Sequence, residues 1–358
     1  MNVSIRFLAL SKIFESSPLL SSSNNKIVMS LGVFRSFFKP IFHHKGDLLV
    51  TRSYFNNFLD NTIVIGRNYY NYLLTNQKHY LIHVVISDTW FNSTASALKG
   101  SAIETNFYCF LIVKSCVFTY CYSVNEGGAI YHMGPDSNLS QCCFDYCTVS
   151  NTLAGSNLGG NTFAITGNCN ISYCHSTRSS PLVGSGGDSL YQLFNGLFNV
   201  REFNGTKNLT PNAGSVAGSF HKNSLGSSVS FSLFMLSCDY SLFETWDSIS
   251  TLLKCNFIKN TLSNNLVCSS SSTIYAKSCS FYGNTVKPPY GTLIISDSFS
   301  DFSTSGATLV PYTLQQITGF HICKLEKTIE TNIPEANLLL SSKLLGNFFL
   351  FLSSFINI

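Results

Sequence analysis

The chain has 358 residues and a net charge of +4, with 22 Lys and Arg residues against 18 Asp and Glu residues. Charged residues make up 11% of the chain and form no run of like charge, so the composition gives no indication of a nucleic-acid partner. The scattered carboxylates argue against the clustered acids that a polysaccharide-cleaving enzyme needs.

Residues 1–84 are expected to form an irregular N-terminal segment or cap, with the first coils of a repeat as the alternative. The apolar stretch Phe7–Leu10 is bracketed too closely by Arg6 and Lys12 for a good signal-peptide core. A degenerate signal stays open, but a cap is favoured because a solenoid needs its ends covered.

From about residue 85 a short sequence motif, called a phrase below, recurs at near-constant spacing. Each copy has a cysteine, a hydrophobe two positions later, and a second cysteine or an asparagine after that. The copies are Cys116–Cys121, Cys142–Cys147, Cys169–Cys174, Cys255–Asn260 and Cys279–Asn284. Their first cysteines are 26 and 27 residues apart in the first three copies and 24 apart in the last two. A fixed period in this range is typical of a solenoid.

The hydrophobe of each copy is taken as the rung of a ladder through the core. The predicted rungs are Phe91, Phe118, Phe144, Ile171 and Phe198, followed by Phe257 and Phe281. Between Phe198 and Phe257 the register is open, because Phe220, Phe231 and Phe234 compete for it. We therefore expect irregular coils near 200–250.

A second phrase runs beside the first and carries paired glycines. Its copies begin at Gly127-Gly128, Gly159-Gly160 and Gly186-Gly187. Glycine pairs suit turns that need a positive φ or a close approach of neighbouring coils. Two periodic phrases in one repeat indicate at least two strands and two turns in each coil.

Short apolar runs separated by Ser, Asn, Thr and Gly predict strands rather than helices. The predicted fold is all-β: a right-handed single-stranded parallel β-helix over 85–300, with about 24–27 residues in each coil. Successive coils would lie about 4.8 Å apart, so that equivalent side chains stack directly. Irregular caps are expected at both ends.

The second cysteine or asparagine of each copy falls where a strand should turn. Asparagines stacked at a turn can bond one another and the turn backbone, and a buried thiol fills a similar volume. We assign this structural role to Cys121, Cys147, Cys174, Asn260 and Asn284. The first cysteines, Cys116, Cys142 and Cys169, are expected to be stacked thiols, with some disulfides among the 13 cysteines left open.

The glycine phrase Gly127–Ile130, together with Phe220–Asn223, Phe257–Asn260 and Phe281–Asn284, resembles the polymorphic outer-membrane protein repeat of chlamydial and trichomonad surface proteins. The resemblance implies a β-helical domain that is secreted or displayed at a cell surface and acts in binding or adhesion, with a protein or glycan as ligand. The family's repeats have no shared catalytic residues. This chain departs from the pattern where cysteine replaces asparagine.

Three kinds of chemical site are weighed and set aside. Glu244 and Asp247, which flank Trp246, are the best carboxylate pair for a pectate-lyase-like enzyme, the runner-up function. The C-x4-C phrase lacks histidines at zinc-ligand spacing, and Gly184–Gly187 lacks the context of a nucleophilic serine. No catalytic, metal or cofactor-binding residue is therefore predicted, and a truncated family member without activity is a further alternative.

Residues 301–358 are expected to form a C-terminal cap or hydrophobic tail. Leu344–Ile358 carries no charge but is short of the about 20 apolar residues that span a membrane. A cap is favoured over membrane association. Asn-X-Ser/Thr sites at Asn92, Asn138, Asn170, Asn204 and Asn208 add weak support for the secretory pathway.

Overall fold

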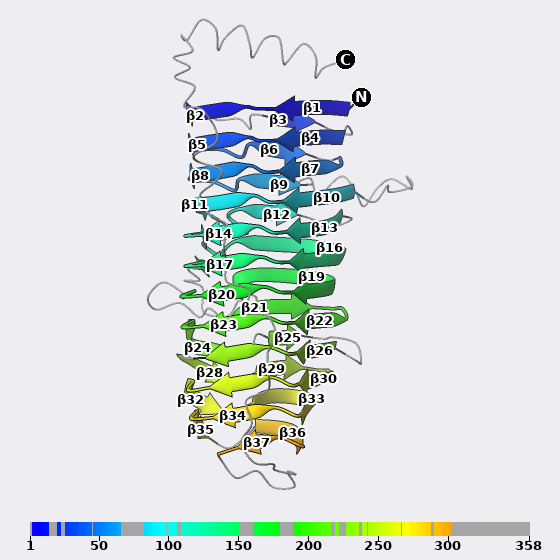
Figure 1. Cartoon of the computed structure of the whole chain (residues 1–358), viewed down its shortest axis with the longest axis vertical. Coiled ribbons are helices and arrows are strands. Elements are labelled where there is room, and N and C mark those ends of the chain that lie inside the picture. Colours follow the sequence, from blue (N-terminus) through cyan, green and yellow to red (C-terminus); the bar gives the residue numbers. More distant parts are fainter. Residues whose placement is uncertain are drawn as a thin grey trace, which may run out of the picture.

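The computed structural model describes residues 2–13, 20–22, 26–44, 46–65, 82–97, 99–105, 109–149, 160–179, 189–215, 219–221, 227–235, 238–241, 243–265, 267–287 and 290–301. Within these ranges all regular elements are β-strands, and the strands pair in parallel (Figure 1). The predicted parallel β-helix is confirmed. Leu344–Ile358 and all residues from 302 onward lie outside the described part of the chain.

The strands form three stacks that run along the solenoid. Sheet A consists of β1 (Asn2–Arg6), β3 (Leu20–Ser22), β4 (Lys26–Ser30), β6 (Phe42–His44), β7 (Leu48–Thr51), β9 (Ile63–Ile65), β10 (Ile82–Ser87), β12 (Ile103–Thr105), β13 (Cys109–Lys114), β16 (Ile130–Ser140), β19 (Gly160–Ser172), β21 (Ser189–Phe194), β22 (Phe198–Arg201), β25 (Ser219–His221), β26 (Ser227–Ser230), β29 (Phe243–Trp246), β30 (Ile249–Leu253), β33 (Val267–Lys277) and β36 (Tyr290–Ser296).

Sheet B consists of β2 (Ala9–Ile13), β5 (Val33–Phe37), β8 (Tyr54–Phe58), β11 (Trp90–Ser96), β14 (Val117–Thr119), β17 (Cys143–Asp145), β20 (His175–Thr177), β23 (Asn204–Thr206), β27 (Leu233–Met235), β31 (Asn256–Ile258), β34 (Ser280–Tyr282) and β37 (Phe299–Ser300). The short strands β15 (Tyr122–Ser123) and β18 (Thr148–Val149) pair beside it. Sheet C consists of β24 (Leu209–Ser215), β28 (Cys238–Ser241), β32 (Thr261–Asn265) and β35 (Thr285–Lys287).

The described part of residues 1–84 consists of regular coils, not an irregular cap. Strands β1 to β9 continue the same parallel pairing, and Val50 of β7 pairs with Ile86 of β10. The repeat is hidden in the sequence here because its cysteines are replaced, for example by Ser53. Near 200–250 the described strands of sheet B keep the same pairing, with Phe234 of β27 paired with Phe257 of β31, whereas the pairing of β24 with β28 has a register shift between Thr210 and Ser215.

An uninterrupted apolar ladder in sheet A forms one wall of the core. Its members pair from coil to coil and alternate with outward-facing residues, as the two-residue period of a strand requires. They are Ile5, Met29, Val50, Ile86, Val113, Leu139, Ile171, Val200, Val229, Leu252, Ala276 and Ile295. Burying one such side chain stabilises the fold by about 1.5–3 kcal/mol.

A phenylalanine stack in sheet B forms the facing wall. Phe118 lies between Phe91 and Phe144, with ring centroids 5.1 and 4.9 Å away and nearly parallel rings. The stack extends upstream through Phe55 to Phe34 and resumes downstream at Phe234, Phe257 and Phe281. Phe220 is not part of it, because it lies in β25 of sheet A.

Two predicted rungs lie elsewhere. Ile171 belongs to the aliphatic ladder of sheet A, and Phe198 pairs with Cys169 in the same sheet. After Phe144 the rung position passes instead to Ser176 and then to Gly205. The coil that ends at Ser176 is longer than its neighbours, so the constant spacing read from the sequence shifted the assignment from one sheet to the other.

Each coil bends into sheet B at a residue with positive φ. This first corner is occupied by Phe7, Leu31, Arg52, Asp88, Ser115, Gln141, Tyr173, Glu202, Phe231, Lys254, Ser278 and Asp297. From Phe7 to Ser278, the backbone N–H of each corner residue donates to the carbonyl that precedes the next corner, as Gln141 does to Ser172 at 3.0 Å. A left-handed conformation costs a non-glycine residue free energy, which this repeated hydrogen bond offsets.

Candidate binding surface

The cysteines next to the first corner form a column of backbone-bonded side chains. Sγ of Cys142 contacts the carbonyls of Ser140 and Val113 at 3.3 and 3.5 Å. Ser53 and Thr89 occupy the same position in other coils and donate to the carbonyl two residues before them. A hydroxyl or thiol donor at this position therefore closes the corner, and Cys is one of three residue types that supply it.

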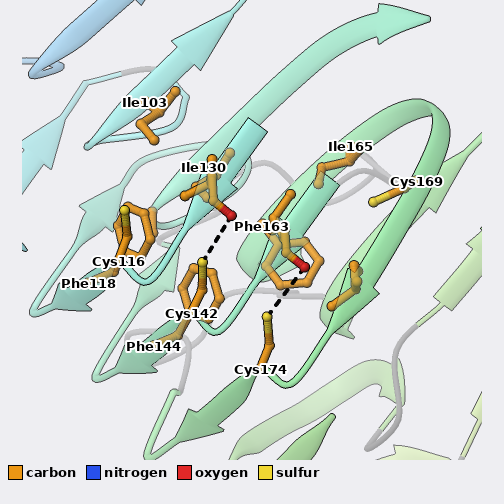
Figure 2. Packing of buried hydrophobic residues seen from close by; sticks show 14 of the residues in the cluster. Ile103, Cys116, Phe118, Ile130, Cys142, Phe144, Phe163, Ile165, Cys169 and Cys174 are labelled. Carbon is orange, nitrogen blue, oxygen red and sulfur yellow. Dashed lines mark hydrogen bonds between the residues drawn. The ribbon is translucent and has the colours of Figure 1, made fainter. Parts of the chain in front are cut away.

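Cys174 belongs to this corner column, not to the Cys121 column that the sequence predicted. Figure 2 shows Cys116, Cys142 and Cys174 in one row, with Cys169 apart from them in sheet A. Sγ of Cys174 contacts the carbonyls of Ser172 and Leu139, the equivalents of the Cys142 partners. The third C-x4-C phrase is thus out of register with the first two.

The column that follows the rung holds Cys121 and Cys147 in the upper coils and Asn260 and Asn284 in the lower ones. Nδ2 of Asn284 donates to the Phe257 carbonyl at 2.8 Å, while its Oδ1 accepts from the backbone and side chain of Asn260. Sγ of Cys147 contacts the equivalent carbonyl, that of Phe118, at 3.5 Å. These residues bind the backbone of adjacent coils and are buried.

Of the predicted turn glycines, Gly127 has the clearest conformational requirement. Its φ is +57°, and a Cβ there would lie 2.1 Å from the carbonyl oxygen of Ile130. Gly128 accepts a hydrogen bond from Ser101 at its carbonyl. Gly160 begins β19 and pairs with Ser189. Gly159, Gly186 and Gly187 lie outside the described residues.

Several of the interior thiols are poor metal ligands. Burial raises the pKa of Cys109 and Cys169 to about 12 and that of Cys116 and Cys174 well above the ordinary value, so these side chains stay protonated. In the described ranges no three His, Cys, Asp or Glu side chains come together as a metal site.

A half-buried ionic cluster lies outside sheet A next to the glycine turn. Nζ of Lys99 is 2.8 Å from Glu126 and donates to the Tyr131 hydroxyl at 3.0 Å. Burial lowers the pKa of Lys99, but the hydrogen bonds to Glu126 and Tyr131 outweigh it and raise the pKa overall. Burial also raises the pKa of Tyr131 to about 12. Because the Lys99 ammonium pairs with the Glu126 carboxylate, the cluster ties two coils together.

His132 lies in the core on the opposite face of the same strand. Its Nδ1 is 2.6 Å from the hydroxyl of Thr105, and its ring packs against Gly134, where a Cβ would lie 2.6 Å from the ring. Burial lowers the pKa of His132 to about 4. The imidazole is therefore neutral at physiological pH and acts as a core side chain.

A cluster of accessible large side chains lies along the second corner, where each coil leaves sheet B. Tyr120 and Tyr146 are 56% and 40% exposed, and their rings stack at 5.0 Å with an interplanar angle of 8°. The Arg178 guanidinium lies 4.5 Å from the Tyr146 ring centroid. Nε of Arg178 donates to Asp145 at 2.9 Å, which fixes the guanidinium beside the ring. We call Tyr120, Tyr146 and Arg178 the corner platform.

The line of second corners continues from the corner platform to two exposed lysines. The N–H groups of Tyr120, Tyr146, Arg178, Lys207 and Lys259 each donate to the carbonyl of the next coil, so these residues occupy equivalent positions. All have positive φ, which points their side chains away from the core. This edge therefore carries small polar residues in the upper coils (Ser36, Asn57 and Ser93), then the aromatic Tyr120 and Tyr146, and then the cationic Arg178, Lys207 and Lys259.

A polar row lies on the outer face of sheet A. Asn138, Asn170, Asn199, Ser228 and Thr251 pair in direct succession, and the three asparagines are exposed. Asn138 and Asn170 are also sites of the Asn-X-Ser/Thr type, whereas Asn204 and Asn208 are buried. The polar row does not extend along the whole solenoid, because the equivalent positions before and after it are occupied by Ile112 and Tyr275.

For Glu244 and Asp247, the carboxylate pair selected from the sequence, the described residues do not define a site. Asp247 is exposed at a bend with positive φ, and Glu244 lies in β29 opposite Ser219. The side chains of Glu244 and Trp246 are outside the described part of the structure. The corner platform has no periodic signal in the sequence, because its residues come from three coils at unequal spacing.

Comparison of the chain with protein-family models, curated proteins and solved structures finds no match. The described residues include no helix that is long and apolar enough to cross a membrane.

Proposed function

We propose that the chain is a non-enzymatic binding protein, secreted or displayed at a cell surface, whose ligand is a protein or glycan that carries negative charge. The observation that carries the proposal is the corner platform: two stacked, exposed tyrosines joined to an arginine and followed along the same edge by Lys207 and Lys259. Tyr and Arg are the residue types enriched in the energetic centres of binding surfaces.

The platform is suited to binding because its side chains are already ordered. The Tyr120–Tyr146 stack and the Asp145–Arg178 hydrogen bonds restrict rotamers before a ligand arrives, so less entropy is lost on binding. A repeating edge also places chemically similar groups about 4.8 Å apart, a spacing that favours extended ligands. The resemblance to polymorphic outer-membrane protein repeats supports a surface location and an adhesive role.

The test is binding of the purified chain to immobilised neutral and acidic glycans and to acidic proteins, compared with the Tyr146→Ala and Arg178→Ala variants. We expect each variant to weaken binding at least about tenfold. Tyr275→Ala, which removes an exposed tyrosine from the outer face of sheet A, is the matched control and should leave binding unchanged. Binding that is insensitive to both platform variants would contradict the assignment.

The charge component has a separate readout. If Arg178, Lys207 and Lys259 contribute to binding, affinity should fall as salt is raised, because exposed charges are screened over about 8 Å at physiological ionic strength. Retained affinity at high salt, with loss in Tyr146→Ala, would favour a neutral glycan stacked on the tyrosines.

A further inference from the structure

The Asn-X-Ser/Thr triplets of the chain differ in where the fold places their asparagines. Asn138 lies in β16 and Asn170 in β19, and both side chains are exposed on the outer face of sheet A. Each triplet is complete, because Ser140 and Ser172 follow two positions later. Among the described residues no hydrogen bond engages either side-chain amide. Both amides are therefore open to modification in the folded chain.

The two exposed asparagines lie side by side on neighbouring strands (Figure 1). Asn138 pairs with Asn170 in the parallel register, so their Cα atoms are about 4.8 Å apart. The next member of the row, Asn199, is also exposed and pairs with Asn170. It has Arg201 two positions later in place of a hydroxyl residue, so it is no acceptor and serves as a matched control.

Two other triplets have their asparagines in the interior. Asn204 and Asn208 are 3% and 2% exposed. Nδ2 of Asn208 donates to the Ser176 carbonyl at 3.1 Å, and its Oδ1 accepts from the backbone N–H of Ser179 at 2.9 Å. A sugar is bulky and hydrophilic, so the fold cannot close around one at either position.

Asn92 is half-buried, and its amide is held between two neighbouring coils. Its Nδ2 donates to Oδ1 of Asn56 at 2.9 Å, and its Oδ1 accepts from the Thr119 hydroxyl at 2.6 Å. A sugar on Nδ2 would have to displace Asn56. The side chain of Asn2, in the remaining triplet, lies outside the described part of the structure.

We propose that Asn138 and Asn170 are N-glycosylation sites of the folded protein, and that Asn92, Asn204 and Asn208 stay unmodified. The inference rests on the secreted or surface-displayed location in the proposed function. Glycans at this position would cover the outer face of sheet A. Sheet B separates that face from the corner platform, so the glycans leave the platform open to its ligand.

The modification is a group transfer from an oligosaccharide carried on a lipid diphosphate. Nδ2 of the asparagine attacks the anomeric carbon of the first sugar, and the new N–C bond forms as the bond from that carbon to the diphosphate oxygen breaks. The lipid diphosphate leaves with the electron pair of that bond. The amide loses one proton to a basic group of the transferase, and no oxidant or reductant is needed.

Mapping of the modified sites in the full chain tests the proposal. The chain is secreted from a eukaryotic host with an added cleavable signal peptide. Its glycans are then released enzymatically in water labelled with heavy oxygen, which converts each glycosylated asparagine to a labelled aspartate. Mass spectrometry should find label at Asn138 and Asn170. Absence of label at either residue, or label at Asn92, Asn204 or Asn208, would overturn the proposal.

Electrophoretic mobility of single variants gives a second readout. Asn138→Gln and Asn170→Gln should each lose one glycan and the double variant should lose both, whereas the matched control Asn199→Gln should migrate like the parent chain. All three side chains are exposed, so the substitutions should not prevent folding or secretion. Unchanged mobility of the Asn138→Gln/Asn170→Gln variant would also overturn the proposal.

The chain without the added signal peptide separates the two sites from the location. If it stays inside the cell without glycans, while the chain with the signal is modified at Asn138 and Asn170, the proposed location is wrong and the site assignment stands. Tyr146→Ala and Arg178→Ala should keep both glycans. Loss of ligand binding in these platform variants therefore has no bearing on the glycosylation sites.

Discussion

The upper coils and the middle coils fill the same space in different ways. From Phe91 to Phe144 each coil contributes one phenylalanine at the rung, and the rings stack face to face. In the middle coils, Ser176 and Gly205 occupy the rung position. The rings of Phe163 and Phe203 fill the core there from other positions of the coil. Phe163 lies 5.3 Å from Phe144 with its ring tilted by 50°, and Phe203 reaches Phe234 at 6.1 Å.

The difference indicates that each coil of this solenoid keeps its core volume filled, whereas the position of the residue that fills it can change. Close packing penalises a void, so a small rung is tolerated only where a neighbouring column supplies the missing ring. The aliphatic ladder of sheet A needs no such exchange and runs through both regions without a polar member.

The largest expected effects come from removing a ring in either region. Phe118→Ala in the regular stack and Phe163→Ala in the middle should each lower the free energy of unfolding by about 3–5 kcal/mol. Chemical unfolding followed by far-UV circular dichroism measures both. An effect of Phe163→Ala below about 1 kcal/mol would show that Phe163 does not replace the missing rung.

Acid should destabilise the fold through His132. Its folded-state pKa of about 4 lies below the ordinary 6.5, so the unfolded chain binds a proton more readily. The neutral imidazole costs no stability above pH 6.5, and stability falls by about 3 kcal/mol as the pH drops from 6.5 to 4. The slope in that window should flatten in His132→Leu but persist in the control His83→Leu, where the histidine is exposed. Equal slopes in the two variants would contradict the prediction.

Restoring the missing rung should harm the middle coils. Ser176→Phe places a second ring where Phe163 already packs, and overpacking costs about 1–3 kcal/mol. In the Phe163→Ala background the same change should instead recover part of the lost stability. The double-mutant cycle measures this coupling, and additive effects would mean that the two positions do not share one space.

The smallest expected difference in stability is between the asparagines and the cysteines of the column that follows the rung. Asn284→Ala leaves the buried backbone N–H of Asn260 without its acceptor and should cost about 1–3 kcal/mol. Cys147→Ala removes only a weak donor and little volume, so about 1 kcal/mol is expected. Unfolding midpoints of the two variants give the comparison, and equal losses would argue against the amide ladder.

Much of the fold was predictable from the sequence because stacking forces equivalent residues to recur. Phe91, Phe118 and Phe144, and likewise Phe257 and Phe281, lie on one another as their spacing predicted. The error at Cys169 has a physical origin: turns vary in length, and a hydroxyl or thiol at the corner is interchangeable. A phrase defined by cysteine therefore loses the register where Ser53 or Thr89 takes its place.

The candidate surface could not be predicted in the same way. Tyr120, Tyr146 and Arg178 share no residue type, and what unites them is the positive φ of the second corner. Polar and aromatic residues of many kinds occupy such corners here, since the hydrogen bond to the next coil is made by the backbone. The periodicity of the sequence predicts which residues lie in the core, but it does not predict which outward-facing residues form a surface cluster.

The register between Phe144 and Ser176 is the central claim, and engineered disulfides test it most directly. Asp145 pairs with Thr177 in the structure, whereas constant spacing would place Ser172 opposite it. Oxidation of the Asp145→Cys/Thr177→Cys variant should give an intramolecular cross-link in high yield, since paired strands bring Cα atoms within disulfide range. Cross-linking of Asp145→Cys with Ser172→Cys instead would contradict the account.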